Sequence, residues 1–372
     1  MPKQLITPWD FRLGNVDYSY IIKQFGLEPA DDELISRIKD PHRLFKRKLI
    51  FAHRDFDRIL EAQERGEEFV VVTGMMPSGR FHFGHKLIAE LLAWYQRQGV
   101  KLYIAVSDIE ACIVRGLDAR ECRRITFEEY VLNYLALGVD LLNTKKCCIY
   151  SQWKNYHVRD FALMASSKIT LSHVQAMYGL ESSSNVGKIF FPFIQVADIL
   201  HPELPELGGP KPVLVPVGVD QDVHIRLARD IAPKFEMIRP SSIYIKMMCG
   251  LQGPGTKMSS SKPESAVFLS DLPEEAGKKI KNAFTGGRMT AKEQRKLGGQ
   301  PDQCVPYMFL LFHFGDKILK KTFDECTSGT VLCGECKARI AEEVRRFLKE
   351  HQFKMEKARN LLPKVEELQP LL

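Results

Sequence analysis

Two histidines three residues apart, His82 and His85, lie in the segment HFGH, which follows a Pro-Ser-Gly turn. A metal site is a weak interpretation, because no glutamate stands between them and no third ligand is near in sequence. A buried core histidine pair remains open. The start of a helix, however, presents free N–H groups and partial positive charge, and imidazoles add donors to the same anion. We therefore expect a phosphate site, where Gly84 lets a flat base lie against the backbone.

A second candidate is the loop GLQGPGTKMSSSKPE at residues 250–264. Its glycines and serines make it mobile and rich in hydrogen-bond donors. Lys257 at its centre is a flexible point charge, which suits a phosphate that changes position during a reaction. The alternative interpretation is a plain solvated linker between domains. The two loops together are more specific than either alone, because both are suited to one phosphate-bearing ligand.

Alternating strands and helices must position these loops. We predict strands at 69–73, 102–107, 147–150, 213–218 and 242–246, with helices at 85–99, 127–138 and 222–232. This alternation is typical of βαβ crossovers and predicts an α/β fold, a Rossmann-like doubly wound parallel sheet. Ligands on such sheets bind at the carboxyl ends of the strands, so His82, Ser107, Asp108 and residues 218–222 should converge there. The length of 109–212 indicates a helical insertion.

Three regions follow from this pattern. Residues 1–65 are rich in charge and show helical spacing, so we predict an N-terminal helical extension. We expect residues 66–265 to form the Rossmann-like catalytic domain, which includes the serine-rich loop. Strand signals fade after residue 265. We therefore expect residues 266–372 to form an all-helical domain, which holds 19 Lys and Arg against 15 Asp and Glu.

Composition narrows the class of protein. The 372 residues carry a net charge of +7, which permits a polyanionic partner without demanding one. No apolar run reaches the length of a membrane span, and the first residues lack the order of a signal peptide. The nine cysteines are an odd number, which argues against a secreted disulfide framework. We expect a cytoplasmic protein with no membrane partner.

Four of the cysteines form one cluster in the sequence. Cys333 and Cys336 make the segment CGEC, with Cys326 and Cys304 upstream. A zinc site or a disulfide is conceivable here. Because there is no second CxxC pair and the stretch runs into an amphipathic helix, structural thiols are the favoured interpretation.

The order and spacing of HFGH and KMSSS resemble the paired HIGH and KMSKS elements of class I aminoacyl-tRNA synthetases. Within that class, VGVDQD at 217–222 resembles the GxDQ element of the tryptophanyl and tyrosyl subgroup, and GKIFFPFIQVADIL at 187–200 resembles its amino-acid-binding helix. AFTGGR, LGGQPDQC, TSGTVLCGE and the opening PWDF resemble tryptophanyl-tRNA synthetases of the archaeal and eukaryotic type. The resemblance covers essentially the whole chain.

The resemblance implies activation of L-tryptophan with ATP and Mg²⁺, followed by transfer to tRNA(Trp). Mg²⁺ would be bound by the phosphates of ATP and would need no dedicated set of protein ligands. The residues implied in catalysis are His82, His85, Lys257, Ser259 and Ser260. Those implied in ATP binding are Gly74, Gly84, Asp220, Met258 and Ser261.

Recognition of the amino acid departs from the eukaryotic relatives. They place a tyrosine at the position of Val72 and a glutamine at that of Ala105, and neither side chain here can accept the indole N–H. The segment QVADIL resembles bacterial tryptophanyl enzymes, where the aspartate accepts that N–H, so Asp198 is expected in this role. Gln195, Gln221 and Glu110 match positions that hold the amino group of the substrate.

Alternatives remain at this point. Tyrosine is the alternative amino-acid substrate. Tyrosyl enzymes also carry an aspartate at the position of Asp198, but they pair it with a tyrosine where this chain has Val72. A small nucleotidylyltransferase uses a similar histidine tetrad, but lacks the second loop and the helical tail. A non-catalytic RNA-binding relative is the third. The resemblance also implies a homodimer whose helical domain reads the tRNA anticodon.

Overall fold

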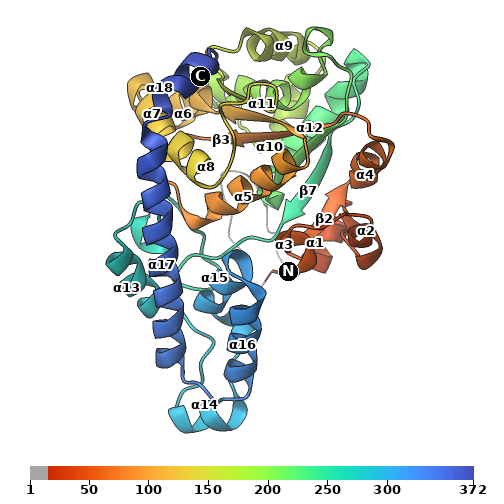
Figure 1. Ribbon diagram of the computed structural model, residues 1–372. Coiled ribbons are helices and arrows are strands. Elements are labelled where there is room, and N and C mark those ends of the chain that lie inside the picture. The colour runs from red at the N-terminus through yellow and green to blue at the C-terminus, as the bar shows by residue number, and fades with distance from the viewer. Residues whose placement is uncertain (1–15, 261) are drawn as a thin grey trace.

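A seven-stranded sheet lies at the centre of the computed structural model, which describes residues 16–260 and 262–372 (Figure 1). The strand order is β1-β2-β7-β6-β3-β4-β5. The five strands from β7 to β5 are parallel, whereas β2 pairs antiparallel with β7, and β1 antiparallel with β2. The strands are β1 (Glu28–Pro29), β2 (Ile50–Arg54), β3 (Val70–Met75), β4 (Lys101–Val106), β5 (Cys147–Ser151), β6 (Val213–Val217) and β7 (Ser241–Ile245).

The five parallel strands confirm the predicted doubly wound sheet. Each forms from a short, largely buried run, as expected of a strand covered on both faces; β3 and β6 are rich in β-branched residues, whereas β5 has one, Ile149. In β3, Gly74 does not end the strand but pairs with Ala105 of β4. A Cβ at Gly74 would lie 3.4 Å from Ser107 Oγ, so this position keeps the carboxyl end of the sheet open.

The N-terminal segment differs from the helical extension predicted for residues 1–65. Its described part contains helices but also β1 and β2, which extend the sheet. The short apolar run of β2 stands between Lys48 and Asp55, two non-glycine residues with positive φ, and this run gave no alternating strand signal. The helices are α1 (Tyr18–Phe25), α2 (Asp32–Ser36), α3 (Arg43–Lys46) and α4 (Phe56–Arg65).

Two apolar layers cover the sheet because successive strand residues face opposite sides. Val71, Leu102 and Ile104 face one cluster with α5, α4 and α8. Val70 and Val72 face the other, under α9 to α12. The catalytic-region helices are α5 (Phe83–Arg97), α6 (Asp108–Arg115), α7 (Ala119–Ile125), α8 (Leu132–Ala136), α9 (Tyr156–Ser166), α10 (Leu171–Tyr178), α11 (Val186–Leu200) and α12 (Asp222–Ile231).

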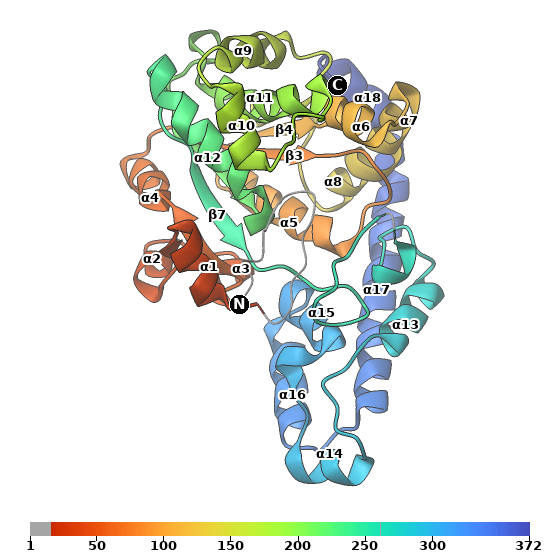
Figure 2. The same ribbon diagram turned by 180° about the vertical axis from the view of Figure 1, so that it is seen from behind.

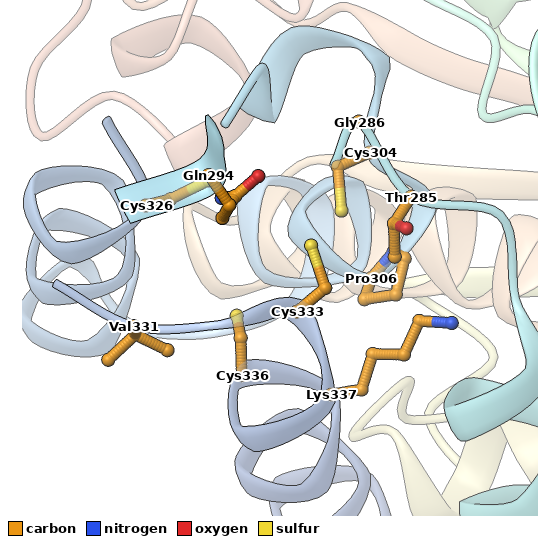
Figure 3. A pocket seen from close by; sticks show the side chains of 10 residues that line it. All are labelled: Thr285, Gly286, Gln294, Cys304, Pro306, Cys326, Val331, Cys333, Cys336 and Lys337. Carbon is orange, nitrogen blue, oxygen red and sulfur yellow. The ribbon is translucent and has the colours of Figure 1, made fainter. Parts of the chain in front are cut away.

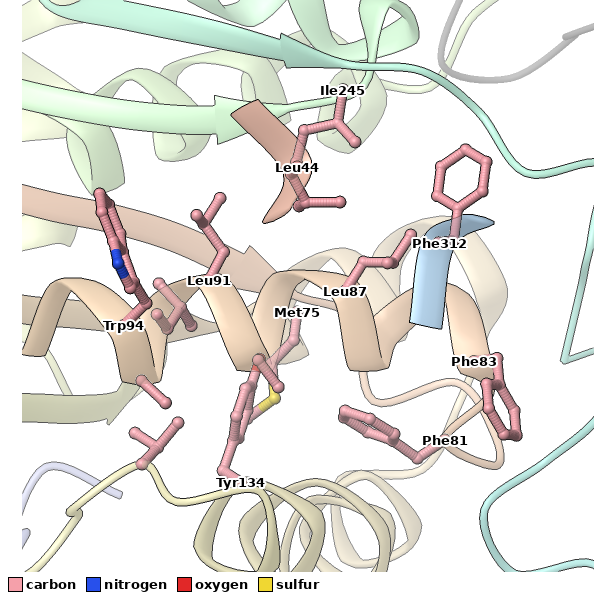
Figure 4. Close-up of a cluster of buried hydrophobic side chains, with 14 of the residues drawn as sticks. Leu44, Met75, Phe81, Phe83, Leu87, Leu91, Trp94, Tyr134, Ile245 and Phe312 are labelled. Atoms are coloured by element: carbon pink, nitrogen blue, oxygen red, sulfur yellow. The ribbon is translucent and has the colours of Figure 1, made fainter. Parts of the chain in front are cut away.

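Helix α5 is the central support of the first layer (Figure 4). Its Leu87 and Leu91 are buried on the side of Leu44 from α3 and Ile245 from β7. At its start, Phe83 is fully buried and packs against Phe309, with 5.2 Å between ring centroids. The start of α5 is therefore fixed between the sheet and the C-terminal helices.

The C-terminal region is helical, as predicted for residues 266–372, and extends away from the sheet (Figure 2). Its long helix α17 packs on α13 and then on α8. Val344 and Leu348 of α17 belong to the same apolar cluster as α5, so no gap separates the helical region from the sheet. The helices are α13 (Pro273–Asn282), α14 (Ala291–Leu297), α15 (Val305–His313), α16 (Asp316–Thr327), α17 (Cys333–Arg359) and α18 (Leu362–Leu368).

The chain finally returns to the sheet. The Gln369 side chain accepts the Ile149 N–H of β5 and donates to the carbonyls of Leu141 and Cys147, and Ser151 N–H donates to the Leu371 carbonyl. These bonds cover the outer edge of β5. In the described residues, none of the helices has the length and apolar character needed to cross a membrane.

Candidate active site

A cleft of about 1480 Å³, partly open to solvent, lies at the carboxyl ends of β3, β4 and β6. The predicted convergence is largely found there, since Ser107, Gly218, Asp220 and Gln221 all line it. Asp108 does not line this cleft; its carboxylate accepts the Ser151 hydroxyl in a neighbouring depression. The predicted site residues that line the cleft are Val72, Gly74, His85, Glu110, Gln195, Asp198, Asp220, Gln221 and Lys257. The predicted residues His82, Gly84, Ser259 and Ser260 do not line it.

The histidine pair forms the start of α5. His82 is the N-cap residue, and its Nδ1 accepts the Gly84 N–H at 3.0 Å. The Nδ1 of His85 in turn accepts the His82 N–H at 3.2 Å. These reciprocal bonds satisfy two backbone donors that a helix start leaves free. The tetrad therefore builds its own capping structure.

The two imidazoles stack with 3.8 Å between centroids and an interplanar angle of 17°. A Cβ at Gly84 would lie 2.8 Å from His82 Cε1, so glycine is required for this arrangement. Burial, with Lys257 nearby, lowers the pKa of His82 to about 4, and burial beside His82 lowers the pKa of His85 well below its usual value. A neutral imidazole whose Nδ1 accepts carries its proton on Nε2. Both rings thus keep an N–H donor for an anion.

The serine-rich loop lies against the Pro-Ser-Gly turn. Ser260 Oγ donates to the Arg80 carbonyl at 2.9 Å, and a Cβ at Gly79 would lie 2.7 Å from Ser260 Cβ. Ser259 N–H donates to Ser265 Oγ at 3.1 Å. Met258 is buried in the apolar cluster under the loop and does not line the cleft. Ser261 lies outside the described residues, as does the PWDF opening.

Lys257 reaches the cleft from this loop. Its Nζ lies 3.5 Å from Asp220 Oδ2, and Gln221 Nε2 donates to the same oxygen at 3.2 Å. A Cβ at Gly218 would lie 2.5 Å from Asp220 Oδ1, so glycine leaves room for the carboxylate at the end of β6. The two predicted loops therefore meet across one cleft.

Asp198 lies at the opposite end of the cleft, on α11, with only 3% of its surface exposed. Its Oδ1 accepts the Tyr150 hydroxyl at 2.9 Å, and its Oδ2 accepts the Gln152 Nε2. Burial raises the pKa of Asp198 to about 7, against the effect of these two donors. The buried Gln152 Oε1 has no hydrogen-bond partner within the described part of the chain. The carboxylate keeps free lone pairs for a donor in the cleft.

The other predicted amino-acid ligands surround Asp198. Gln195 lies one helical turn before it on α11, and Val72 of β3 is buried beside the cleft. Glu110 on α6 is partly buried, and burial raises its pKa to about 7 against the opposing charge of Arg115. Sequence reasoning missed Tyr150 and Gln152. Their position at the carboxyl end of a predicted strand is the signal that could have found them.

Three features meet at one cleft: the ends of parallel strands, the start of α5, from which His85 lines the cleft, and the loop that carries Lys257. This arrangement corresponds to the HIGH and KMSKS elements, and it places the chain in the class I aminoacyl-tRNA synthetases. Residues 64–349 match the model of the family described as "tRNA synthetases class I (W and Y)", and the chain belongs to this family.

Individual relatives agree over nearly the full length. The tryptophan–tRNA ligase of Methanocaldococcus jannaschii is 44% identical over 367 residues, which cover 97% of each chain. The crystal structure of tryptophanyl-tRNA synthetase from Aeropyrum pernix K1 is similar with a TM-score of 0.88 and 42% identity, covering 94% of this chain and 96% of that one. A tryptophanyl-tRNA synthetase from Encephalitozoon cuniculi bound to tryptophan gives a TM-score of 0.84 at 28% identity, covering 95% and 98% of the two chains.

Proposed function

We infer that the chain is a tryptophan–tRNA ligase, an aminoacyl-tRNA synthetase that uses ATP. The tryptophan carboxylate attacks the α-phosphorus of ATP, and pyrophosphate leaves. The acyl group of the resulting adenylate then passes to the terminal ribose of tRNA(Trp), and AMP leaves. The observation that carries this proposal is a single cleft lined by His85, Lys257 and the buried acid Asp198, in a chain 44% identical to a tryptophan–tRNA ligase.

For the first step, we propose that His82 and His85 donate from Nε2 to the phosphates as negative charge builds at the α-phosphorus. Fixed donors stabilise a transition state without reorganising at the moment of reaction. The Lys257 ammonium stays paired with the pyrophosphate as it leaves, while Ser259 and Ser260 hold the loop over the pyrophosphate. This loop also keeps water from the hydrolysable adenylate.

ATP lies along the ends of β3 and β6 in this proposal. Asp220 holds the ribose or the adenine region, and Gly74 and Gly84 let the nucleotide approach the backbone. Asp220 is engaged by Lys257 and Gln221, so these residues would not form a dedicated metal site. A Mg²⁺ ion bound with ATP would supply neutralisation of phosphate charge, while this chain contributes the orienting donors. Met258 supports the loop from below.

Asp198 accepts the indole N–H of tryptophan in the amino-acid pocket. The carboxylate is fixed by Tyr150 and Gln152, and a buried donor or acceptor left unpaired costs about 1–3 kcal/mol. Val72 leaves space for the bicyclic ring where a tyrosine would occupy it. Gln195, Gln221 and Glu110 bind the amino group of the substrate, and an ionised Glu110 provides the negative charge that an ammonium group prefers.

Amino-acid-dependent ATP–pyrophosphate exchange, run with each of the twenty amino acids and without tRNA, tests the function. We expect exchange with tryptophan and at least a hundredfold less with tyrosine, because a site without a phenol hydroxyl partner at position 72 does not select tyrosine. Exchange with tyrosine alone would refute the substrate. No exchange with any amino acid would refute the activation step in the absence of tRNA.

A homodimer is supported by an exposed apolar surface on α9, α10 and α11. Leu163, Met164 and Leu171 are 50–61% exposed, and Val186 is 78% exposed. Helices α9 and α10 both pack on α11, and a contiguous apolar surface marks an interaction site. We propose that this surface forms the dimer interface, that the helical region binds the anticodon of tRNA(Trp), and that the enzyme acts in the cytoplasm. Sedimentation of Leu163→Asp should yield a monomer where the parent chain yields a dimer.

A further inference from the structure

A depression beside the catalytic cleft carries aromatic rings and cations that the proposed reaction does not use. It lies at the ends of β4 and β5, has an empty volume of about 700 Å³ and is partly open to solvent. Ser107 lines the cleft and its neighbour Asp108 lines the depression, so the two hollows meet at the start of α6. The lining of the depression includes Asp108, Arg123, Phe127, Trp153 and Lys154.

The aromatic side chains of the depression are accessible to a planar ligand. Trp153 is 46% exposed, although its large apolar ring would be expected to be mostly buried. Phe127 is partly buried, and the guanidinium of Arg123, which pairs with Glu366, lies over the Phe127 ring at 4.7 Å from the centroid. Aromatic rings and guanidinium planes are the surfaces on which unpaired nucleobases stack. The depression therefore offers stacking surfaces to a nucleobase.

The Phe127 ring belongs to an unusual helical turn. The segment Thr126–Val131 is π-helical, a rare conformation that occurs frequently at functional sites. Within this turn, Phe127 lines the depression and Tyr130 lines the cleft, where the Tyr130 hydroxyl donates to the Met76 carbonyl at 3.1 Å. One π-helical turn thus contributes a ring to each of the two hollows.

The charge around the depression suits a polyanion. Arg120 and Lys154 are exposed and form no ion pair with any residue that the structure describes. The acidic side chain that lines the depression, Asp108, accepts the Ser151 hydroxyl, so a donor of the chain already engages it. Unpaired cations beside a stacking surface are what a single-stranded sugar–phosphate chain requires.

The cavity among four cysteines at the tip of the helical region has a different character (Figure 3). Its empty volume is about 350 Å³, half that of the depression, and its four thiols are free, so no disulfide joins them. It lies away from the sheet, at the end of the molecule opposite the cleft (Figure 1). A group that must reach the reacting carbonyl is therefore served by the depression and not by this cavity. The four cysteines are Cys304, Cys326, Cys333 and Cys336.

We propose that the depression binds a base of the unpaired 3′ end of tRNA(Trp), stacked on Trp153. This inference rests on the proposed function, in which the terminal ribose of tRNA reaches the acyl group in the cleft. Helix α6 stands between the two hollows, since Glu110 lines the cleft and Asp108 lines the depression. A strand that crosses the start of α6 leaves its terminal ribose in the cleft, while a preceding base lies on Trp153 and its phosphates lie near Arg120 and Lys154.

Single-turnover transfer from preformed tryptophanyl-adenylate to a tRNA(Trp) transcript tests the proposal on the full-length chain. At subsaturating tRNA, Trp153→Ala should slow transfer about 5- to 150-fold, the range expected for the loss of one stacked base. Trp153→Phe should stay within about threefold of the parent chain, because a phenyl ring also stacks. The matched control is Tyr156→Ala, which should leave transfer unchanged, since Tyr156 is 53% exposed but does not line the depression. Pyrophosphate exchange without tRNA should be unaltered in all three variants, which also shows that they fold.

A transcript that lacks the unpaired 3′ nucleotides separates base stacking from a structural effect. Trp153→Ala should weaken binding of the intact transcript and leave binding of the shortened transcript unchanged, as a pairwise contact requires. Equal weakening of both transcripts, or of neither, would overturn the proposal. A change from dimer to monomer in sedimentation of Trp153→Ala would assign the depression to contact between two copies, and would also overturn it.

Failure of the proposed function would give a different result. Absence of tryptophan-dependent pyrophosphate exchange in the parent chain would refute the ligase itself. Normal exchange together with parental transfer in Trp153→Ala would leave the ligase in place and overturn only the binding of the 3′ end in the depression.

Discussion

The two ends of the cleft are built in different ways. At the end proposed to bind phosphate, His82, Gly84 and His85 cap one helix start through bonds between residues two or three apart. At the amino-acid end, Asp198 is held by Tyr150 and Gln152, which lie 48 and 46 residues away along the chain. In the proposed mechanism, the reaction common to every amino acid therefore depends on local backbone structure. Selectivity for the amino acid would depend on tertiary contacts, which can change without disturbing the helix start.

The largest effect is expected at the phosphate end. His85→Ala and His82→Ala should each slow adenylate formation by about 10²–10³-fold, the usual effect of removing one fixed donor from a developing charge. Rapid-quench measurement of the adenylate would show this directly. A rate within threefold of the parent chain would contradict the donor role.

His82 offers a matched control, because its ring also caps α5. His82→Asn retains an N-cap acceptor for the Gly84 N–H but cannot place a donor where Nε2 lies. We expect this variant to unfold at the temperature of the parent chain and still to lose the adenylate rate. If His82→Ala and His82→Asn lose the same amount of stability and the same amount of adenylate rate, His82 acts only as the N-cap of α5.

A smaller effect is expected at the amino-acid end. Asp198→Asn should raise the KM for tryptophan about 10- to 150-fold, since a hydrogen bond to a charged group contributes roughly 1.5–3 kcal/mol. The KM for ATP should stay unchanged in pyrophosphate exchange. The fold should tolerate this change, because the Gln152 amide can turn and offer its unpaired Oε1 to the new amide. An equal rise in both KM values would make Asp198 a structural carboxylate.

The two ends should also differ in pH dependence. Burial raises the pKa values of Asp198 and Glu110 to about 7, so both carboxyls ionise as pH rises from 6 to 8, and tryptophan should bind several-fold more tightly over this interval. ATP binding should change less, since burial keeps both histidines neutral there. Because the folded pKa of Asp198 lies above its ordinary value of 3.8, its ionisation opposes folding as pH rises from about 4 through 7. Tryptophan titrations by fluorescence across this range, repeated with Asp198→Asn, check the assignment; an unaltered profile in the variant would contradict it.

The smallest effect is expected behind the pocket. Tyr150→Phe removes one donor to Asp198 and should weaken tryptophan binding by roughly 0.5–1.5 kcal/mol, or about two- to tenfold. The matched control is Tyr95→Phe, because the buried Tyr95 hydroxyl has no hydrogen-bond partner in the part of the chain that the structure describes. That change should leave tryptophan binding unaffected. Equal effects from both substitutions would exclude a specific role for the Tyr150 hydroxyl.

The same contrast explains what sequence reasoning could reach. The five parallel strands, the helix start at His82 and the lysine loop follow from runs of adjacent residues, and the structure contains all of them. Strand β2 was missed, because its short run has no alternation and it joins the sheet at an antiparallel pairing. Tyr150 and Gln152 were missed for another reason: their contact with Asp198 exists only once β5 and α11 have packed together. Met258 was assigned to ATP, but its apolar side chain is buried beneath the loop.

The hydrogen bonds from Gln369 to the edge of β5 have a consequence for the synthesis of the chain on the ribosome. Gln369 is 220 residues from Ile149, so the ribosome makes β5 long before the segment that covers its outer edge. Until then, β5 exposes unpaired backbone groups to which strands of other chains can bind. The edge of the nascent sheet is therefore closed only when residues 369–371 emerge.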